Sequence, residues 1–317
     1  RGAWLFGAGH HPNSLLRNNG DGSFSDVTES AGLLSFRPTQ TAAWADFNND
    51  GWLDVYIGNE QTERDPHPCE LYLNNKDGTF TEHASRAGIT VNAWVKGISS
   101  GDFDNDGWLD LWAVGEKIRV WRNLGLSGFQ EQTVPLGLES YSDGEVSEIH
   151  FADFDRDCDS DVIIALASGG VRFLRNEGGN ANLQVKVQMF GNRSNASGIG
   201  CKIEIEADGL RLRRTVERLP VEVGVGKNRK LDSFVVHWFN WPQGSAEVPV
   251  NCQEPLLAME LTIQEGSCPY LYAWDGKGFR FITDILGASP LGLPIAAGRH
   301  IEADPEELVW IGDEQSF

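Results

Sequence analysis

Short runs of alternating apolar and polar residues, divided by turns rich in glycine and aspartate, make up most of the chain. The alternation is clear over 53–57, 109–114 and 183–189, where successive side chains would point to opposite faces of a strand. Glycine is abundant at 36 residues, while Trp and Phe number 11 and 16 and Met only 2. Frequent tight turns combined with aromatic and β-branched packing are typical of an all-β protein.

A hairpin pattern recurs along the first half of the chain. Residues 15–24 are matched by 71–80 and more loosely by 120–129, and a further copy starts at 171–178. An Asp-Gly pair between two apolar runs, as at Asp77, strongly favours a β-hairpin. Because each unit of roughly 50 residues holds about four short strands, we expect β-propeller blades, about three of them within residues 1–178.

Three acidic loops accompany these hairpins, starting 56 and then 51 residues apart. Oxygen-bearing side chains stand at every second position, and a final aspartate stands at the ninth. Ca²⁺ takes about six to eight oxygen ligands, so we expect side chains one, three, five and nine and the seventh backbone carbonyl to bind it. The candidate ligand positions are Asp46, Asn48, Asp50, Trp52 and Asp54, then Asp102, Asp104, Asp106, Trp108 and Asp110, then Asp153, Asp155, Asp157, Asp159 and Asp161.

The loops differ from an EF-hand, which closes with a glutamate at its twelfth position between two helices. Here the flanks have strand patterns. The alternative is that aspartate, asparagine and glycine simply make good turns. The third loop has Cys158 where the others have Gly51 and Gly107, and a cysteine is strained if that position needs a positive φ. We therefore expect two to three Ca²⁺ ions.

Residues 1–178 resemble FG-GAP/VCBS repeats, the calcium-loop propeller blades also found in integrin α subunits. The resemblance is carried by 45–55 and 101–111, which are close to the family's consensus, while Cys158 and the aspartate missing from the hairpin near Gly125 depart from it. It implies a partial propeller with calcium in its loops. Since a propeller has about four to eight blades, we expect further blades before Arg1 in a longer polypeptide.

Residues 179–265 follow a different pattern, with alternating segments that predict a small antiparallel β-sandwich. This region resembles the ASPIC/UnbV domain, through Gly191, Ser194, Asn195, Gly198, Ile199, Gly200, Trp238, Pro242 and Gly244. Its basic stretch 211–214 alternates with apolar residues and is interpreted as the exposed face of a strand. Residues 266–317 begin with a hairpin over 270–281, continue through a loop over 286–298, and form the start of a third, truncated β-rich region.

Net charge, hydropathy and cysteine content narrow the range of possible functions and partners. A net charge of −20 argues against a nucleic-acid partner, which would need a basic face. No window approaches 18 apolar residues, so we expect no membrane insertion. The five cysteines contain no Cys-x-x-Cys pair, and either Cys252 and Cys268 form a disulfide or the thiols are free and buried.

We expect no catalytic residues. Residues 97–101 fit the Gly-x-Ser-x-Gly pattern, but an acidic loop follows where a nucleophile elbow needs a helix. Asn192 and Asn195 begin glycosylation patterns that coincide with a predicted turn. Trp52 and Trp108 are either exposed platforms for sugars or packed between blades, and the shared position favours packing.

These features favour a calcium-stabilised extracellular or cell-surface scaffold for binding or adhesion, which recognises protein or glycan. Millimolar calcium outside cells suits sites of modest affinity. Two alternatives stay open. One is a carbohydrate-active or other enzyme with its active site in blades outside this sequence. The other is a structural subunit of a larger surface assembly.

Overall fold

The computed structural model describes residues 12–60, 67–91, 94–115, 117–139, 146–239, 242–261, 270–274, 278–284, 294–296 and 299–300. The chain divides into two compact units, Arg1–Glu260 and Leu261–Phe317. Residues 3–6 and 308–312, whose apolar sequences also predict strands, lie outside the described residues. No helix among the described residues is long and apolar enough to cross a membrane.

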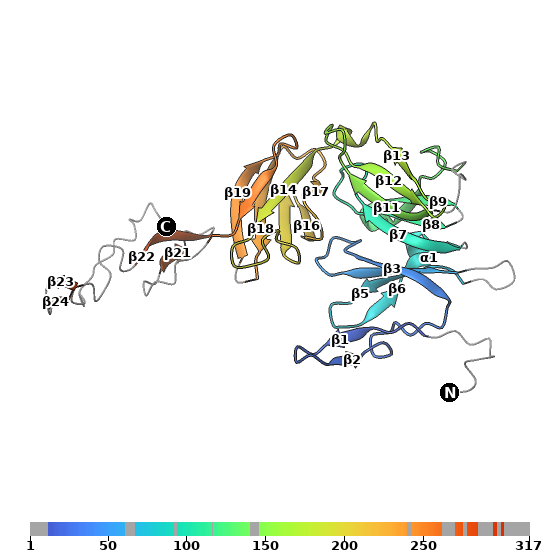
Figure 1. The fold of residues 1–317 in the computed structure, drawn as a ribbon, viewed down its shortest axis with the longest axis horizontal. Helices are drawn as coiled ribbons and strands as arrows, with labels where there is room; N and C mark the ends of the chain where they lie inside the picture. Colours follow the sequence, from blue (N-terminus) through green and yellow to red (C-terminus); the bar gives the residue numbers. More distant parts are fainter. Residues whose placement is uncertain are drawn as a thin grey trace. The chain divides into compact units, whose positions relative to one another are not determined.

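The regular structure of the described residues is almost entirely antiparallel sheet, which confirms the predicted all-β class (Figure 1). The exceptions there are one turn of α-helix, α1 (Ala84–Ala87), and two 3₁₀ turns, η2 (Gly125–Ser127) and η3 (Gly179–Ala181). Gly88 ends α1 in the left-handed conformation with φ of 79°, as is common after a helix.

Each blade-like sheet is a meander in which consecutive strands are neighbours. The sheet orders are β3-β4-β5-β6, β10-β9-β8-β7 and β11-β12-β13, and a further hairpin pairs β1 with β2. The strands are β1 (Leu16–Asn18), β2 (Phe24–Asp26), β3 (Thr39–Ala45), β4 (Asp54–Asn59), β5 (Glu70–Asn74), β6 (Phe80–Glu82), β7 (Val95–Gly101), β8 (Asp110–Gly115), β9 (Ile118–Asn123), β10 (Phe129–Glu131), β11 (Val146–Ala152), β12 (Asp161–Leu166) and β13 (Val171–Leu174).

Apolar residues hold consecutive sheets against one another. Tyr56 and Leu71 share one buried cluster with Leu111 and Trp121 of the next sheet. The other face of that sheet contributes Trp112 to a cluster with Phe151 of the third sheet, and the two rings meet edge to face at 5.5 Å. Face-to-face stacking of meanders is how propeller blades pack. The third sheet has three strands among the described residues instead of the expected four, because the chain passes from β13 towards η3.

Two further sheets follow within the first unit and enclose one apolar core. The orders are β17-β14-β20 and β16-β15-β18-β19. Their strands are β14 (Gln184–Phe190), β15 (Lys202–Ala207), β16 (Leu210–Thr215), β17 (Val221–Gly224), β18 (Lys230–His237), β19 (Pro242–Pro249) and β20 (Leu256–Met259). Met189, Ile203, Ile205, Leu231 and Trp238 are buried between them. We call residues 184–259 the second domain.

The described part of the second unit contains two short antiparallel pairs. β21 (Tyr270–Trp274) pairs with β22 (Phe279–Asp284), as the hairpin prediction required. β23 (Pro294–Ala296) pairs with β24 (Arg299–His300). β23 forms inside the segment that was expected to be a loop, most of which lies outside the described residues.

Candidate metal centres

The first residue of each acidic loop organises the turn that follows it. Asp46 accepts hydrogen bonds from the backbone N–H groups of Asp50 at 3.0 Å and Gly51 at 2.9 Å. The same bonds recur in the second loop, at 3.1 and 2.8 Å, and in the third, at 3.2 and 3.0 Å. One turn geometry is therefore built three times, between the first two strands of each blade.

The ninth residue closes each loop from the start of the second strand. Asp54 is fully buried and accepts the backbone N–H groups of Phe47 at 3.1 Å and Asn74 at 2.9 Å. Asp110 and Asp161 repeat this arrangement with the N–H groups of the equivalent phenylalanine and asparagine. The closing carboxylate thus joins its loop to the end of the third strand of the same blade.

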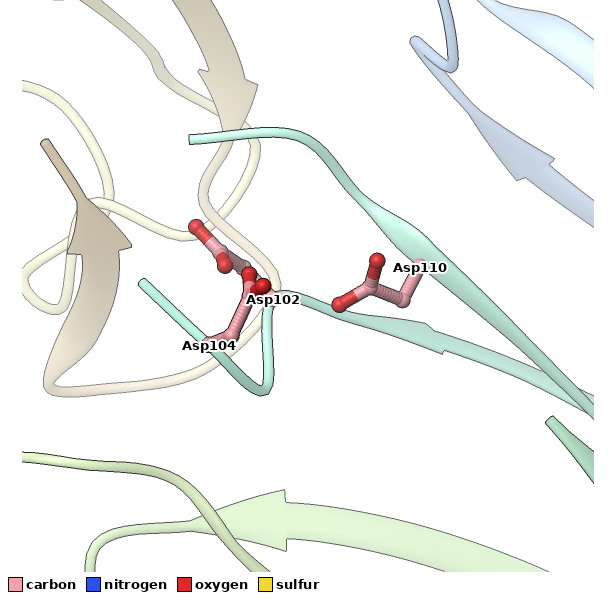
Figure 2. Close-up of side chains that lie close together, drawn as sticks. All are labelled: Asp102, Asp104 and Asp110. Atoms are coloured by element: carbon pink, nitrogen blue, oxygen red, sulfur yellow. The ribbon is translucent and has the colours of Figure 1, made fainter. Parts of the chain in front are cut away.

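Carboxylates converge in the second and third loops. Ligand oxygens of Asp102, Asp104 and Asp110 all lie within 4.8 Å of one another, and those of Asp153, Asp155 and Asp161 do the same. Figure 2 shows the Asp110 carboxylate directed towards the other two side chains of its cluster. No such group of three acids occurs in the first loop among the described residues. The first loop carries an amide, Asn48, at its third position.

The surroundings of these loops disfavour the ionised form of the aspartates and so raise their pKa values. Burial, followed by the neighbouring charge of Asp106, raises the pKa of Asp102 to about 7. Burial also raises the pKa of Asp54 to about 7 and that of Asp104 to about 6. The pKa of Asp110 is raised well above its usual range, again by burial first. A cation would offset this cost, because opposite charge favours the ionised form.

The donor atoms present fit a hard divalent cation. The buried Oδ1 atoms of Asp104 and Asp159 have no hydrogen-bond partner, and a buried polar atom of this kind calls for a ligand. The donors are oxygens of carboxylates and an amide, together with backbone carbonyls. Such oxygen donors suit Ca²⁺ better than they suit softer metals. Two of the three loops therefore hold a carboxylate oxygen that the protein itself leaves unpaired.

Basic side chains of the blades also contact the acidic loops. Lys76 lies 3.3 Å from Asp50, Arg122 lies 3.0 Å from Asp106, and Arg175 lies 3.7 Å from Asp155. Arg122 and Arg175 directly precede the asparagines that bond to the closing aspartates. The loop pattern alone does not reveal these residues. The repeating asparagine of each hairpin is the signal by which Arg122 and Arg175 can be found.

The two tryptophans at the seventh position differ in surroundings. Their backbone N–H groups each donate to the fifth-position aspartate of the same loop at 2.9 Å. The Trp108 ring lies against the η2 turn, where a Cβ on Gly125 would come within 2.7 Å of it. Trp52 leaves 47% of its surface exposed. The Trp108 ring is therefore closely packed, whereas the Trp52 ring is not.

The third loop contains a disulfide that was not predicted. Cys158 pairs with Cys252, at a Cα–Cα distance of 5.8 Å, so the suggested pairing of Cys252 with Cys268 is wrong. Pairing follows proximity in the fold, and the segment that precedes β20 lies beside this loop, where Gln253 also donates to the carbonyl of Arg156. Cys158 has φ of 80°, close to the 88° of Gly51 and the 91° of Gly107, so this position does need a positive φ. Cys69 and Cys201 are buried free thiols.

The second domain lies against the acidic loops. Arg213 donates to the carbonyl of Gly51 at 3.3 Å, and Arg214 donates to the carbonyl of Gly107 at 2.9 Å. The prediction that this basic stretch faces solvent holds for Arg211 but is wrong for Arg213 and Arg214, which are half-buried against the loops. The reason is that β16 is the edge strand of its sheet, and its side chains reach the loops of two blades.

A cavity of about 580 Å³ lies between the innermost strands of the three blades and the second domain. Trp44 and Phe151 line it on the blade side, and Arg218 and Glu217 line it on the side of the second domain. Ser99 also lines it, but this residue lies within β7 and pairs with Trp112. The serine therefore does not occupy a turn between a strand and a helix.

The first part of the chain is a stack of propeller-like blades. In each blade an aspartate loop joins the first two strands. Residues 5–57 and 61–113 match the FG-GAP-like repeat. The two matches contain the first and second acidic loops, which confirms this part of the resemblance. The VCBS assignment, the third repeat and the ASPIC/UnbV resemblance of residues 179–265 stay predictions.

The chain is similar to cartilage acidic protein 1 from several vertebrates. It is 29% identical over 164 residues to the protein of Xenopus tropicalis, which covers 49% of this chain and 25% of that protein. It is 32% identical over 101 residues to the Homo sapiens protein, which covers 32% of this chain and 15% of that protein. The chain thus spans about a quarter or less of the length of the curated relatives it matches.

Proposed function

We propose that this chain is a calcium-stabilised binding scaffold, in which the acidic loops hold Ca²⁺ and fix the blades. The observation that carries the proposal is the convergence of Asp102, Asp104 and Asp110, together with a buried oxygen of Asp104 that has no hydrogen-bond partner. A bound Ca²⁺ would add positive charge to that of Arg122, which already pairs with Asp104 and Asp106. The ligands would be the side chains at positions one, three, five and nine and the seventh backbone carbonyl of each loop.

The residues around each site hold the proposed ligands in position. Backbone N–H groups orient the first and ninth carboxylates, so the ligand geometry is set by the turn and by the neighbouring strands. In the absence of a cation the clustered carboxylates repel one another and resist ionisation. Cation binding would therefore stabilise the connection between the first two strands of a blade, and through it the stack of blades.

An extracellular or cell-surface location follows as part of the proposal. A disulfide such as Cys158–Cys252 persists mainly in oxidising compartments. Loops of modest calcium affinity would be filled by the millimolar calcium found outside cells. The similarity to cartilage acidic protein 1 is in keeping with this location. The proposed partners are protein or glycan ligands, with adhesion or assembly at a surface as the broader role.

A second candidate function is an enzyme that acts on a glycan, and the cavity favours it. His150, Arg218 and Glu217 line this cavity together with Trp44, so acidic, basic and aromatic groups face one space. Pockets with a few convergent polar groups are common ligand sites. A panel of glycans tested for binding and then for cleavage separates the candidates, because a scaffold would bind without turnover.

Calcium removal tests the main proposal. The purified full chain should contain two or three calcium ions by mass spectrometry, and excess Ca²⁺ should raise its melting temperature more than Mg²⁺ does. At a Ca²⁺ concentration of about 100 times the Kd, one site adds roughly 2.7 kcal/mol to the free energy of unfolding.

Asp104→Asn should weaken calcium binding at the second loop. Asp77→Asn, in an exposed hairpin, should leave the calcium content unchanged. Absence of calcium together with an unchanged melting temperature would refute the proposal.

A further inference from the structure

The fourth residue of each acidic loop has a distinctive backbone. Asn49, Asn105 and Arg156 have φ of 52°, 56° and 65°, in the left-handed region that few residues other than glycine adopt. Asparagine tolerates this region better than most residues. None of these three residues belongs to the proposed ligand set, so their side chains are free to serve another purpose.

The two asparagines make the same bond to the next loop in the chain. Asn49 Nδ2 donates to the carbonyl of Gly107 at 3.0 Å, and Asn105 Nδ2 donates to the carbonyl of Cys158 at 2.8 Å. In each case the fourth residue of one loop contacts the sixth residue of the following loop. Two bonds of identical type, one per blade junction, link the three loops in series.

Each accepting residue is itself bound to the first ligand of its own loop. The N–H group of Gly107 donates to Asp102 at 2.8 Å, and that of Cys158 donates to Asp153 at 3.0 Å. The carbonyl oxygen that accepts from the preceding loop lies immediately before the seventh residue, whose own carbonyl is a proposed ligand. A shift of the donor amide would therefore move the ligands of the neighbouring site.

The second domain donates hydrogen bonds to the side-chain oxygens of both asparagines. Arg214 donates to Asn49 Oδ1 at 3.2 Å, and Gln184 donates to Asn105 Oδ1 at 3.2 Å. Because a guanidinium group has no acceptor, the Asn49 oxygen must face it and the Asn49 nitrogen must face the next loop. Asn105 is fully buried, which removes competition from water for its bonds.

We propose that the acidic loops bind Ca²⁺ cooperatively, with Asn49 and Asn105 as the positioning residues that couple each loop to the next. This inference rests on the proposed calcium function. Ordering of one loop holds its fourth-position amide in place, and the amide then holds the sixth-position peptide of the next loop in its binding geometry. Coupling of this kind is reciprocal, so each site would strengthen the other by the same factor.

Calorimetric titration of the calcium-depleted full chain with CaCl₂ tests the proposal. Asn49→Gly and Asn105→Gly remove the donor amides but keep the left-handed backbone accessible. Arg156→Gly is the matched control, since Arg156 has the same place and φ in the third loop and no acidic loop of this type follows it within residues 162–317. The native chain and the control should bind cooperatively. Each asparagine variant should weaken binding at the linked sites by about 5- to 150-fold, the usual range of allosteric coupling.

A double-mutant comparison separates coupling from local damage. Asp50→Asn disables the first loop, and it should weaken calcium binding at the second loop in the native background but not in the Asn49→Gly background. Circular dichroism confirms that each variant is folded. If Asn105→Gly does not fold, the half-exposed Asn49 still tests the first link. Calcium binding with independent sites that the asparagine variants leave unchanged overturns the coupling alone. Failure of the native chain to bind calcium overturns the proposed function as well.

Discussion

At the scale of single residues, this protein uses buried carboxylates in two opposite ways. Asp102 is surrounded by other carboxylates, and its pKa rises to about 7, chiefly through burial. Glu260 is also buried, but its oxygens accept the backbone N–H groups of Asn192, Arg193 and Ser194 at 2.7 to 2.8 Å. Burial raises the pKa of Glu260, yet these donors outweigh it and lower the pKa to about 2. Both carboxylates accept backbone N–H groups, but Asp102 also lies beside other carboxylates, whose negative charge adds to the effect of burial on its pKa.

The Glu260 carboxylate should make stability depend on pH. Because its folded pKa of about 2 lies below the usual value near 4.3, its contribution is present above about pH 4.3 and lost as the pH falls towards 2. Glu260→Gln should lower the free energy of unfolding at pH 7 by about 1–3 kcal/mol and flatten its acid dependence. Urea unfolding between pH 2 and 7 measures both effects. Glu254→Gln, at an exposed position nearby, should change neither, and an unaltered acid profile for Glu260→Gln would contradict the assignment.

At the scale of elements, the contact between β17 and the second acidic loop depends on a close backbone approach. A Cβ at Gly224 would lie 2.1 Å from Asp102 Oδ2 and 2.5 Å from the Cα of Asn105. Gly226 completes the contact, since its N–H group donates to the carbonyl of Asn105 at 2.8 Å. The strand thus packs directly on the loop, and the absence of a side chain at Gly224 makes this possible.

Gly224→Ala should therefore separate β17 from the loop and destabilise the first unit. The extra methyl has no space, and overpacking of this kind typically costs about 1–3 kcal/mol. Thermal or urea unfolding provides the measurement. Gly178→Ala is the control, because nothing lies within 4 Å of a Cβ there and φ is not positive. Equal stability of the two variants would show that the close approach is not maintained in solution.

At the scale of the whole first unit, the second domain contacts all three acidic loops. Arg213 reaches the first loop, Gly226 the second, and Lys186 makes an ion pair with Asp153 of the third. The disulfide Cys158–Cys252 adds a covalent link across a sequence separation of 94 residues. The blades and the second domain therefore share one interface built on the candidate metal centres.

Removal of this disulfide should be costly, since closure of a long loop restricts the unfolded chain strongly. Cys252→Ser combined with Cys158→Gly, which keeps the left-handed backbone accessible, should lower the free energy of unfolding by about 2–4 kcal/mol. Melting temperatures measured with and without a reducing agent check this. The reductant should destabilise the native chain but leave the double variant unaffected. An identical response of both proteins would exclude a stabilising disulfide.

The sequence by itself determined the features that depend on local spacing. Alternation and Asp-Gly turns predicted the all-β class, and the repeat of about 50 residues predicted the stacked meanders. The spacing within the acidic loops identified the carboxylates that converge in the second and third loops. The glycines at the equivalent positions raised the question of a positive φ at Cys158, and its φ is indeed 80°. The turns, the loop carboxylates and the backbone at Cys158 follow from chemistry within about ten residues of chain, where the backbone leaves few options. The blades follow from the longer repeat.

Only the tertiary structure decided which distant residues meet. The pairing of Cys158 with Cys252, the hydrogen bond from Arg214 to Gly107 and the amide links between loops join residues more than 50 positions apart. No local pattern marks them, because the docking of one sheet edge on several loops sets their partners. The physical reason is that spacing fixes which groups a turn presents, whereas packing of the domains fixes what those groups contact.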